Sequence, residues 1–233
     1  ERVNTFFTSE MLDTVDAVMP GWRKMSSYAN GVTLTHVMCV FTGLLTSLEY
    51  RQASYAQQEL MKWAVCLHDV AKKVHPGQRD NTHAFRSAAL AGKILPQIGF
   101  PVTDEYPTIF EKWFTFTGTA ITKKGATGPD IQDNRKLPKI IAGIERLFGF
   151  NTPAALVIKT VLLHHSVTVV EKWPQTASLT KTELKQYLDI ELFPLLKMMM
   201  LADNDGWNLF NPSIRDQYRQ DTLEVFNQLA PVD

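Results

Sequence analysis

Apolar residues of this 233-residue chain recur three and four positions apart in most segments, whereas the alternating runs typical of strands are scarce. Residues 138–148 show the helical spacing clearly, because Ile140, Ile144 and Leu147 fall on one face of a helix. We therefore predict an all-α fold. The chain shows no internal repeat and no low-complexity tract, so we expect residues 1–233 to form a single helical domain.

Start and stop signals give the predicted helix boundaries. Thr152–Pro153 is a cap followed by proline at the first helical position, and Thr180 with Glu183 forms a capping box. The predicted helices cover residues 8–19, 33–51, 55–73, 82–95, 138–148, 153–165, 180–203 and 213–229, and a short aromatic helix begins at Pro107. Residues 117–138, rich in Gly, Thr, Asp and Pro, are predicted to form a loop within an insertion at about 101–137.

The composition argues against two classes of partner. Lys and Arg total 24 and Asp and Glu total 24, so the chain lacks the basic excess of a protein that mainly binds nucleic acid. The longest uncharged stretch, residues 26–48, carries Asn, Thr, His and Ser side chains and is not expected to span a membrane. Cys39 and Cys66 are interpreted as buried, reduced thiols of a cytoplasmic protein.

The segment "AVCLHDVAKK", residues 64–73, places the pair His68–Asp69 directly after four uncharged residues. Burying a carboxylate without a partner costs several kcal/mol, so this pair either faces water or is compensated by another charge. Adjacent helix residues point about 100° apart, and both side chains can reach one object that lies beside the helix. A divalent cation is such an object, because it accepts a neutral imidazole and a carboxylate together.

Two other segments place similar side chains after apolar runs. His164–His165 follows such a run in "VLLHHSV", and Asp203 does so in "MMMLADNDGW". Asp205 lies about 200° around the helix from Asp203, so only one of them is expected to face a given point, and we favour Asp203. His36 sits among apolar and small residues, where the alternative is a buried histidine bonded to a backbone carbonyl.

The order His … His-Asp … His … His-His … Asp resembles the HD superfamily of metal-dependent phosphohydrolases. The residues that carry the resemblance are His36, "HDVAK" at 68–72, His83, His164–His165 and Asp203. The sequence "HDVAKK" is similar to the common "HDIGK" form, and "HAFRSAALAGKILPQIGFP" looks like the helix that follows the pair in this family. The resemblance spans roughly residues 30 to 210 and implies an HD-type helical bundle.

The resemblance implies six metal ligands, namely His36, His68, Asp69, His83, His164 and Asp203. In binuclear members the Asp of the pair bridges the two ions, and this would be Asp69. His165 matches an extra ligand as well as His164 does. The long separation of His83 from His164 departs from compact members, and in a mononuclear centre both would contact phosphate instead. One or two divalent ions are expected, with Mn or Fe preferred and Mg, Ni or Co as alternatives.

The activity that the resemblance implies is that of a phosphohydrolase or phosphodiesterase. It would hydrolyse a phosphoester or phosphoanhydride in a small molecule, with a nucleotide favoured, through a hydroxide that the metal activates and with Asp69 at the reacting centre. Lys72 is expected to bind a phosphate oxygen and Arg86 to be a second contact, the alternatives being a solvated lysine and a surface ion pair. His165, if not a ligand, is expected to protonate the leaving oxygen.

Two other functions fit the same residues. Some proteins with this ligand pattern are di-iron oxygenases that cleave C–C or C–P bonds, and metal identity with O2 dependence separates them from hydrolases. The other alternative is a non-catalytic HD module that binds a nucleotide. The insertion at about 101–137 is interpreted as the element that sets substrate specificity, because it lies between ligand-bearing helices.

Overall fold

The computed structural model describes residues 31–73, 80–167 and 178–230, together with Glu10, Asp13 and Ala17. The helix predicted over 8–19 lies outside the continuously described residues. Within these ranges helices dominate and the only sheet has two short strands, which confirms the all-α prediction.

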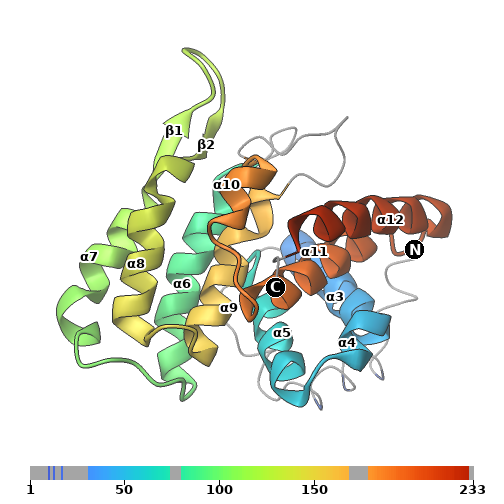
Figure 1. Ribbon diagram of the computed structural model, residues 1–233, viewed down its shortest axis with the longest axis horizontal. Helices are drawn as coiled ribbons and strands as arrows, with labels where there is room; N and C mark the ends of the chain where they lie inside the picture. The colour runs from blue at the N-terminus through green and yellow to red at the C-terminus, as the bar shows by residue number, and fades with distance from the viewer. Residues whose placement is uncertain are drawn as a thin grey trace.

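Figure 1 labels the elements in their order along the chain. The helices are α3 (Gly31–Thr46), α4 (Leu48–Gln52), α5 (Tyr55–Leu67), α6 (His83–Gln97), α7 (Tyr106–Gly118), α8 (Leu137–Phe148), α9 (Pro153–Leu163), α10 (Lys181–Lys185), α11 (Leu192–Trp207) and α12 (Pro212–Leu229). Short 3-10 turns are η2 (Asn134–Lys136) and η3 (His164–Ser166), and the strands are β1 (Ile121–Lys123) and β2 (Asp130–Gln132).

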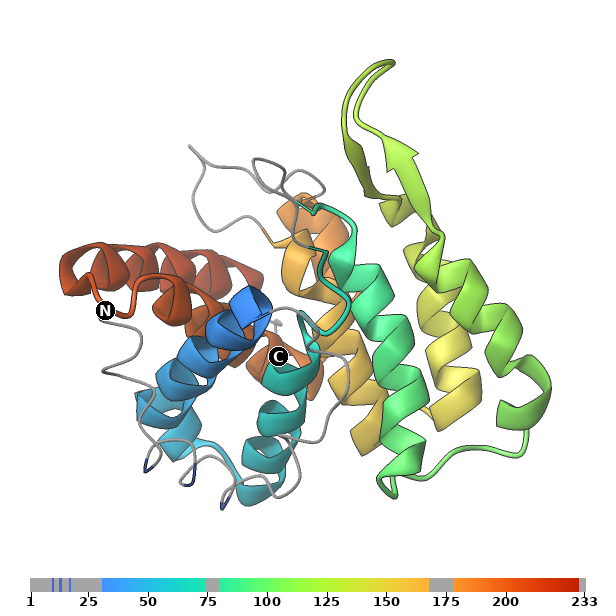
Figure 2. The same ribbon diagram turned by 180° about the vertical axis from the view of Figure 1, so that it is seen from behind.

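Helix α9 lies in the middle of the molecule and is buried along its length. On one side it packs against α6 and α8, with α7 outermost; on the other it packs against α5 and α11 (Figures 1 and 2). Its sequence explains this position, since Leu156, Val157, Ile158 and Val161 make it apolar all round. The Thr152 side chain accepts a hydrogen bond from the Ala155 amide, which confirms the predicted cap.

Helices α3 and α11 lie side by side and make the closest helix contact in this half of the fold (Figure 1). Two glycines allow the approach. A Cβ added to Gly206 would stand 2.7 Å from the backbone nitrogen of Val40, and one added to Gly43 would stand 2.9 Å from the Cβ of Asp205. The backbones of these two helices therefore meet where no side chain fits between them.

Replacing Gly206 by Ala is expected to destabilise the fold by about 1–3 kcal/mol, the usual cost of overpacking. The new methyl group meets backbone atoms of Val40, which cannot rotate away. Urea unfolding of G206A beside the wild-type protein measures the loss. The matched control is G118A, because a Cβ on Gly118 meets nothing within 4 Å. Equal midpoints for G206A and wild type would contradict the close approach.

The helix predicted over 55–73 is shorter than expected, because α5 ends at Leu67 and His68 is its C-cap. A continued helix would pair the Val65 carbonyl with the Asp69 amide. That carbonyl instead accepts a hydrogen bond of 2.6 Å from Nδ1 of His68. The His-Asp pair therefore lies in the turn after the helix, where its side chains are not limited to helical directions.

The helix predicted over 180–203 is two helices, α10 and α11, rather than one helix bent at Pro194. The capping box of Thr180 and Glu183 is present at the start of α10. The break precedes the proline because the Asp189 carboxylate accepts hydrogen bonds from the amides of Glu191 and Leu192. Such side-chain bonds compete with helical pairing and are typical of helix starts.

Within the predicted insertion, α7 confirms the short aromatic helix expected to begin at Pro107. The segment 117–138 contains more regular structure than the loop we expected, because it holds an antiparallel β1–β2 hairpin that projects beyond the helices (Figures 1 and 2). The strands are only three residues each, and half of their side chains are exposed, so alternation of polar and apolar residues is too weak to predict them. Positive φ at Gly125 turns the hairpin.

Two predictions from the composition, on membrane spans and on the cysteines, can be compared with the structure. None of the described helices is long and apolar enough to cross a membrane. Cys39 and Cys66 are buried thiols, and burial raises the pKa of the Cys66 thiol to about 12.

Candidate metal centre

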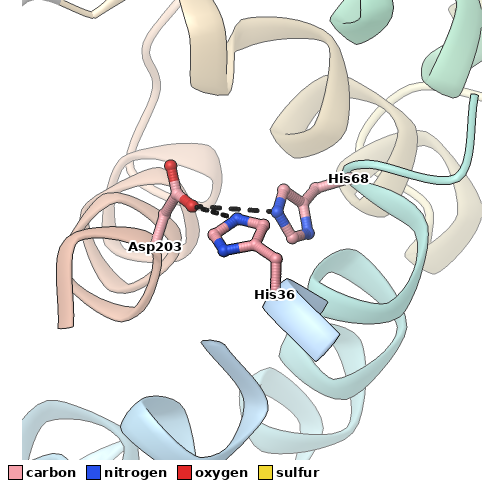
Figure 3. Close-up of side chains that lie close together, drawn as sticks. All are labelled: His36, His68 and Asp203. Carbon is pink, nitrogen blue, oxygen red and sulfur yellow. Dashed lines mark hydrogen bonds and ion pairs between the residues drawn. The ribbon is translucent and has the colours of Figure 1, made fainter. Parts of the chain in front are cut away.

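Three side chains converge from three helices near the contact of α3 and α11. His36 lies on α3, His68 at the end of α5 and Asp203 on α11, and Figure 3 shows both rings facing the carboxylate. The Nε2 atoms of His36 and His68 lie 3.0 and 3.8 Å from Oδ1 of Asp203. One ligand atom from each residue lies within 4.8 Å of the others, so this group could hold a metal ion.

A second group lies beside the first and is more deeply buried. Asp69 follows His68, His83 is the first residue of α6, and His164 caps the end of α9. Nε2 of His83 lies 3.0 Å from Oδ1 of Asp69 and 3.3 Å from Nε2 of His164. These three residues could also hold a metal ion. The structure thus brings together all six side chains that the sequence indicated as ligands.

Asp69 connects the two groups through its two oxygens. Its Oδ2 lies 3.6 Å from Nε2 of His36 and 3.7 Å from Nε2 of His68, while its Oδ1 faces His83 and His164. A carboxylate that points one oxygen at each of two ligand sets can bridge two cations.

The ring orientations of three histidines in the centre leave their Nε2 atoms as hydrogen-bond acceptors. Nδ1 of His68, His83 and His164 lies 2.6, 2.7 and 2.6 Å from the carbonyls of Val65, Asp80 and Val161. A carbonyl only accepts, so in the neutral rings Nδ1 carries the proton and Nε2 presents a lone pair. Backbone carbonyls commonly orient metal-binding histidines in this way.

These lone pairs leave several acceptor atoms of the centre without a hydrogen-bond donor. Nε2 of His83 and His164 are two acceptors 3.3 Å apart, which repel each other. Among the described residues, Nε2 of His68 and Oδ1 of Asp69 are buried with no hydrogen-bond partner. Such orphaned acceptors are costly in a protein interior. A cation between them would compensate all of these atoms, so the donor set fits divalent metal ions that accept nitrogen and oxygen ligands.

The charge states at neutral pH suit metal binding. Burial, together with nearby His68 and His83, lowers the pKa of His164 to about 3, so its ring is neutral. Burial also lowers the pKa of His68. Burial alone would raise the pKa of Asp69, but His68, His83 and Lys72 outweigh it and hold that pKa well below its ordinary value. Neutral imidazoles and an ionised carboxylate are the forms that metals bind.

Lys72 points into the centre. Its Nζ lies 2.6 Å from Oδ2 of Asp69 and 5.4 Å from the ring centroid of Trp207. The alternative of a freely solvated lysine is therefore wrong for this side chain. Binding of a phosphate oxygen by Lys72 stays a prediction.

Arg86 contacts protein groups on the opposite side of His83. It forms an ion pair with Asp80 and donates to the hydroxyl of Thr82 and the carbonyl of Ala71. Asp80 in turn uses its carbonyl to accept from the ring of His83. This arrangement favours the ion-pair interpretation of Arg86, which then orients the segment that carries His83.

His165 and Asp205 lie outside both ligand groups. The ring of His165 is buried and its centroid lies 4.7 Å from that of His83. Asp205 forms an ion pair with Arg219, with 2.9 Å between Oδ2 and the guanidinium. Its separation from the centre agrees with our preference for Asp203.

Sequence reasoning missed Trp207 and Gln132. Trp207 ends α11, lies with its ring tilted against that of His36 at 4.4 Å between centroids, and is still 63% exposed. Its position four residues after Asp203 is a usable signal, since residues at that spacing share a helix face. Gln132 stands on a strand that the sequence does not predict, so no signal could have indicated it.

Comparison of the chain with family models, curated proteins and solved structures found no match. The resemblance to the HD superfamily therefore depends on the ordered residues alone.

Proposed function

We propose that this protein is a metal-dependent phosphohydrolase of the HD type with a binuclear centre. The observation that supports the proposal most is the placement of Asp69, one oxygen toward His36 and His68 and the other toward His83 and His164. Two divalent ions bound at such a centre would supply a hydroxide at neutral pH and would stabilise the charge on phosphate oxygens.

The protein's own residues have separable roles in this proposal. His36, His68 and Asp203 would hold one ion, His83 and His164 would hold the other, and Asp69 would contribute an oxygen to each. The ammonium group of Lys72, which contacts Asp69, would bind a phosphate oxygen. His165, whose ring lies beside that of His83, would donate a proton to the leaving oxygen in this proposal.

The test combines metal content with turnover. The full chain, purified without chelator, is analysed for metal per chain and then assayed with nucleotides and simple phosphate esters in the presence of Mn or Fe. Two ions per chain and metal-dependent release of phosphate would support the proposal. A mixed-valent iron pair that consumes O2 would replace it with the oxygenase alternative, and bound nucleotide without turnover would replace it with the binding-module alternative.

Trp207 favours a substrate with a flat ring. Its indole is largely exposed although it lies against His36 and below the ammonium of Lys72. An exposed aromatic surface beside a phosphate site provides a stacking contact for a nucleobase, and such contacts are worth about 1–3 kcal/mol. We therefore propose that the substrate is a nucleotide.

Replacing Trp207 by Ala is expected to raise KM for nucleotides about tenfold, because about 1.4 kcal/mol of stacking is lost. The KM for glycerol phosphate, which has no ring, is expected to stay unchanged. Steady-state assays with both substrates measure the difference. W63A is a matched control, since Trp63 packs against Phe100 away from the centre. An equal rise in KM for both substrates would contradict ring recognition.

A further inference from the structure

The two histidines of the second ligand group lie at the ends of helices and not within them. His83 begins α6 directly after the segment 80–82, and His164 begins the short turn η3 after α9 has ended. The chain between them includes α7, the hairpin and α8. The 3.3 Å between the two Nε2 atoms therefore depends on contacts that fix these segments relative to each other.

Gln132, the last residue of β2, contacts both segments. Its backbone amide donates to the carbonyl of Asn81 at 3.2 Å, two residues before His83. Its side-chain Nε2 donates to the hydroxyl of Ser166 at 2.8 Å, two residues after His164. The residue is only 1% exposed, so these bonds form away from competing water.

The base of the hairpin holds Gln132 in place. Gln132 pairs with Ile121 in the strand register, and the next amide, that of Asp133, donates to the carbonyl of Ala120 at 2.9 Å. The second hydrogen of the Gln132 amide group bonds to Oδ1 of Asn134 at 3.0 Å, which fixes the direction of the first toward Ser166. Backbone and side chain of one residue thus join the two histidine-bearing segments.

We infer that Gln132 is a positioning residue for the second metal ion, the one held by Asp69, His83 and His164. The inference depends on the proposed binuclear centre and gives the hairpin of the insertion a role in metal binding. It also accounts for the long stretch between His83 and His164, because that stretch contains the element that joins them. The first ion, at His36, His68 and Asp203, does not depend on these bonds.

The decisive experiment is a calorimetric titration of the metal-free full chain with Mn²⁺. Gln132→Met keeps the length of the side chain but removes its hydrogen bonds. We expect Q132M to bind the second ion about 10–100-fold more weakly, the usual cost of losing an outer-shell partner, and the first ion with unchanged affinity. General destabilisation would lower the affinity for both ions. A loss of affinity for the second ion alone therefore distinguishes a positioning role from an effect on folding.

Two further variants complete the design. Ser166→Ala removes only the side-chain acceptor and is expected to lower the affinity for the second ion alone. This variant keeps the inference testable if Q132M does not fold. Lys123→Met removes the exposed ion pair of Lys123 with Asp130 in the same hairpin and is expected to leave the affinity for both ions unchanged. Wild-type affinity for both ions in Q132M and S166A would overturn the inference.

The outcomes also separate this inference from the proposed function. A wild-type chain that binds a single ion overturns the inference, and one that binds none overturns both. Two bound ions with no phosphate release would contradict the proposed reaction. The inference would then be tested by the Mn²⁺ affinities of the variants alone.

Discussion

Asp69→Asn is expected to abolish phosphate release and to lower the metal content of the purified chain from two ions to one or none. Asp69 supplies an oxygen to each ligand group, so one substitution affects both. The amide keeps the size of the side chain but removes the charge that offsets two cations. We expect turnover to fall at least about 10³-fold, equivalent to about 4 kcal/mol of transition-state stabilisation. Elemental analysis and phosphate assays measure the two effects.

Asp205→Asn is the matched control for this substitution. Asp205 is also a buried aspartate close in sequence to a ligand, but its carboxylate pairs with Arg219 and lies outside both groups. D205N should therefore keep two ions and its turnover even if its stability falls. If D69N kept both ions and wild-type turnover, Asp69 would not be the bridging ligand. Circular dichroism of both variants verifies that they are folded.

The ligand set could be predicted from the sequence because of its local context. His68–Asp69, His164 and Asp203 each follow an apolar run, and the first three of these residues are buried where they need compensation, while Asp203 is partly buried. His36 and His83 were added to the predicted set by the resemblance to the HD superfamily. The start of α9 was equally predictable, since Thr152 and Pro153 act through contacts within one helical turn.

The errors concern features that depend on contacts distant in sequence or on competing local bonds. The end of α5 is set by the bond from the ring of His68 to Val65, which also orients a ligand. The hairpin is stabilised at its base by bonds to Asn81 and Ser166, which stand far from it in the chain. Neither effect leaves a periodic pattern in the sequence, so the prediction gave a longer helix and a plain loop.

Removing the metal is expected to destabilise the whole fold. The candidate ligands come from α3, α5, α6, α9 and α11, so bound ions would connect helices on both sides of the molecule. An ion present at a thousandfold excess over its dissociation constant stabilises the folded state by about 4 kcal/mol. For a domain of this size each kcal/mol shifts Tm by about 2–4 °C.

Chelation should therefore lower Tm by about 10 °C or more, and adding Mn²⁺ back should restore it. The Nε2 atoms of His83 and His164 lie 3.3 Å apart, and the ammonium group of Lys72 pairs with Asp69, so bound ions would add attractive contacts at this point of the fold. Calorimetric melting with and without chelator gives the shift. The same scans on D69N provide the control, because a variant that retains fewer ions has less metal to lose and should show a smaller shift. An equal shift in both proteins would mean that chelation acts elsewhere, and no shift in the wild-type chain would exclude a structural contribution from bound metal.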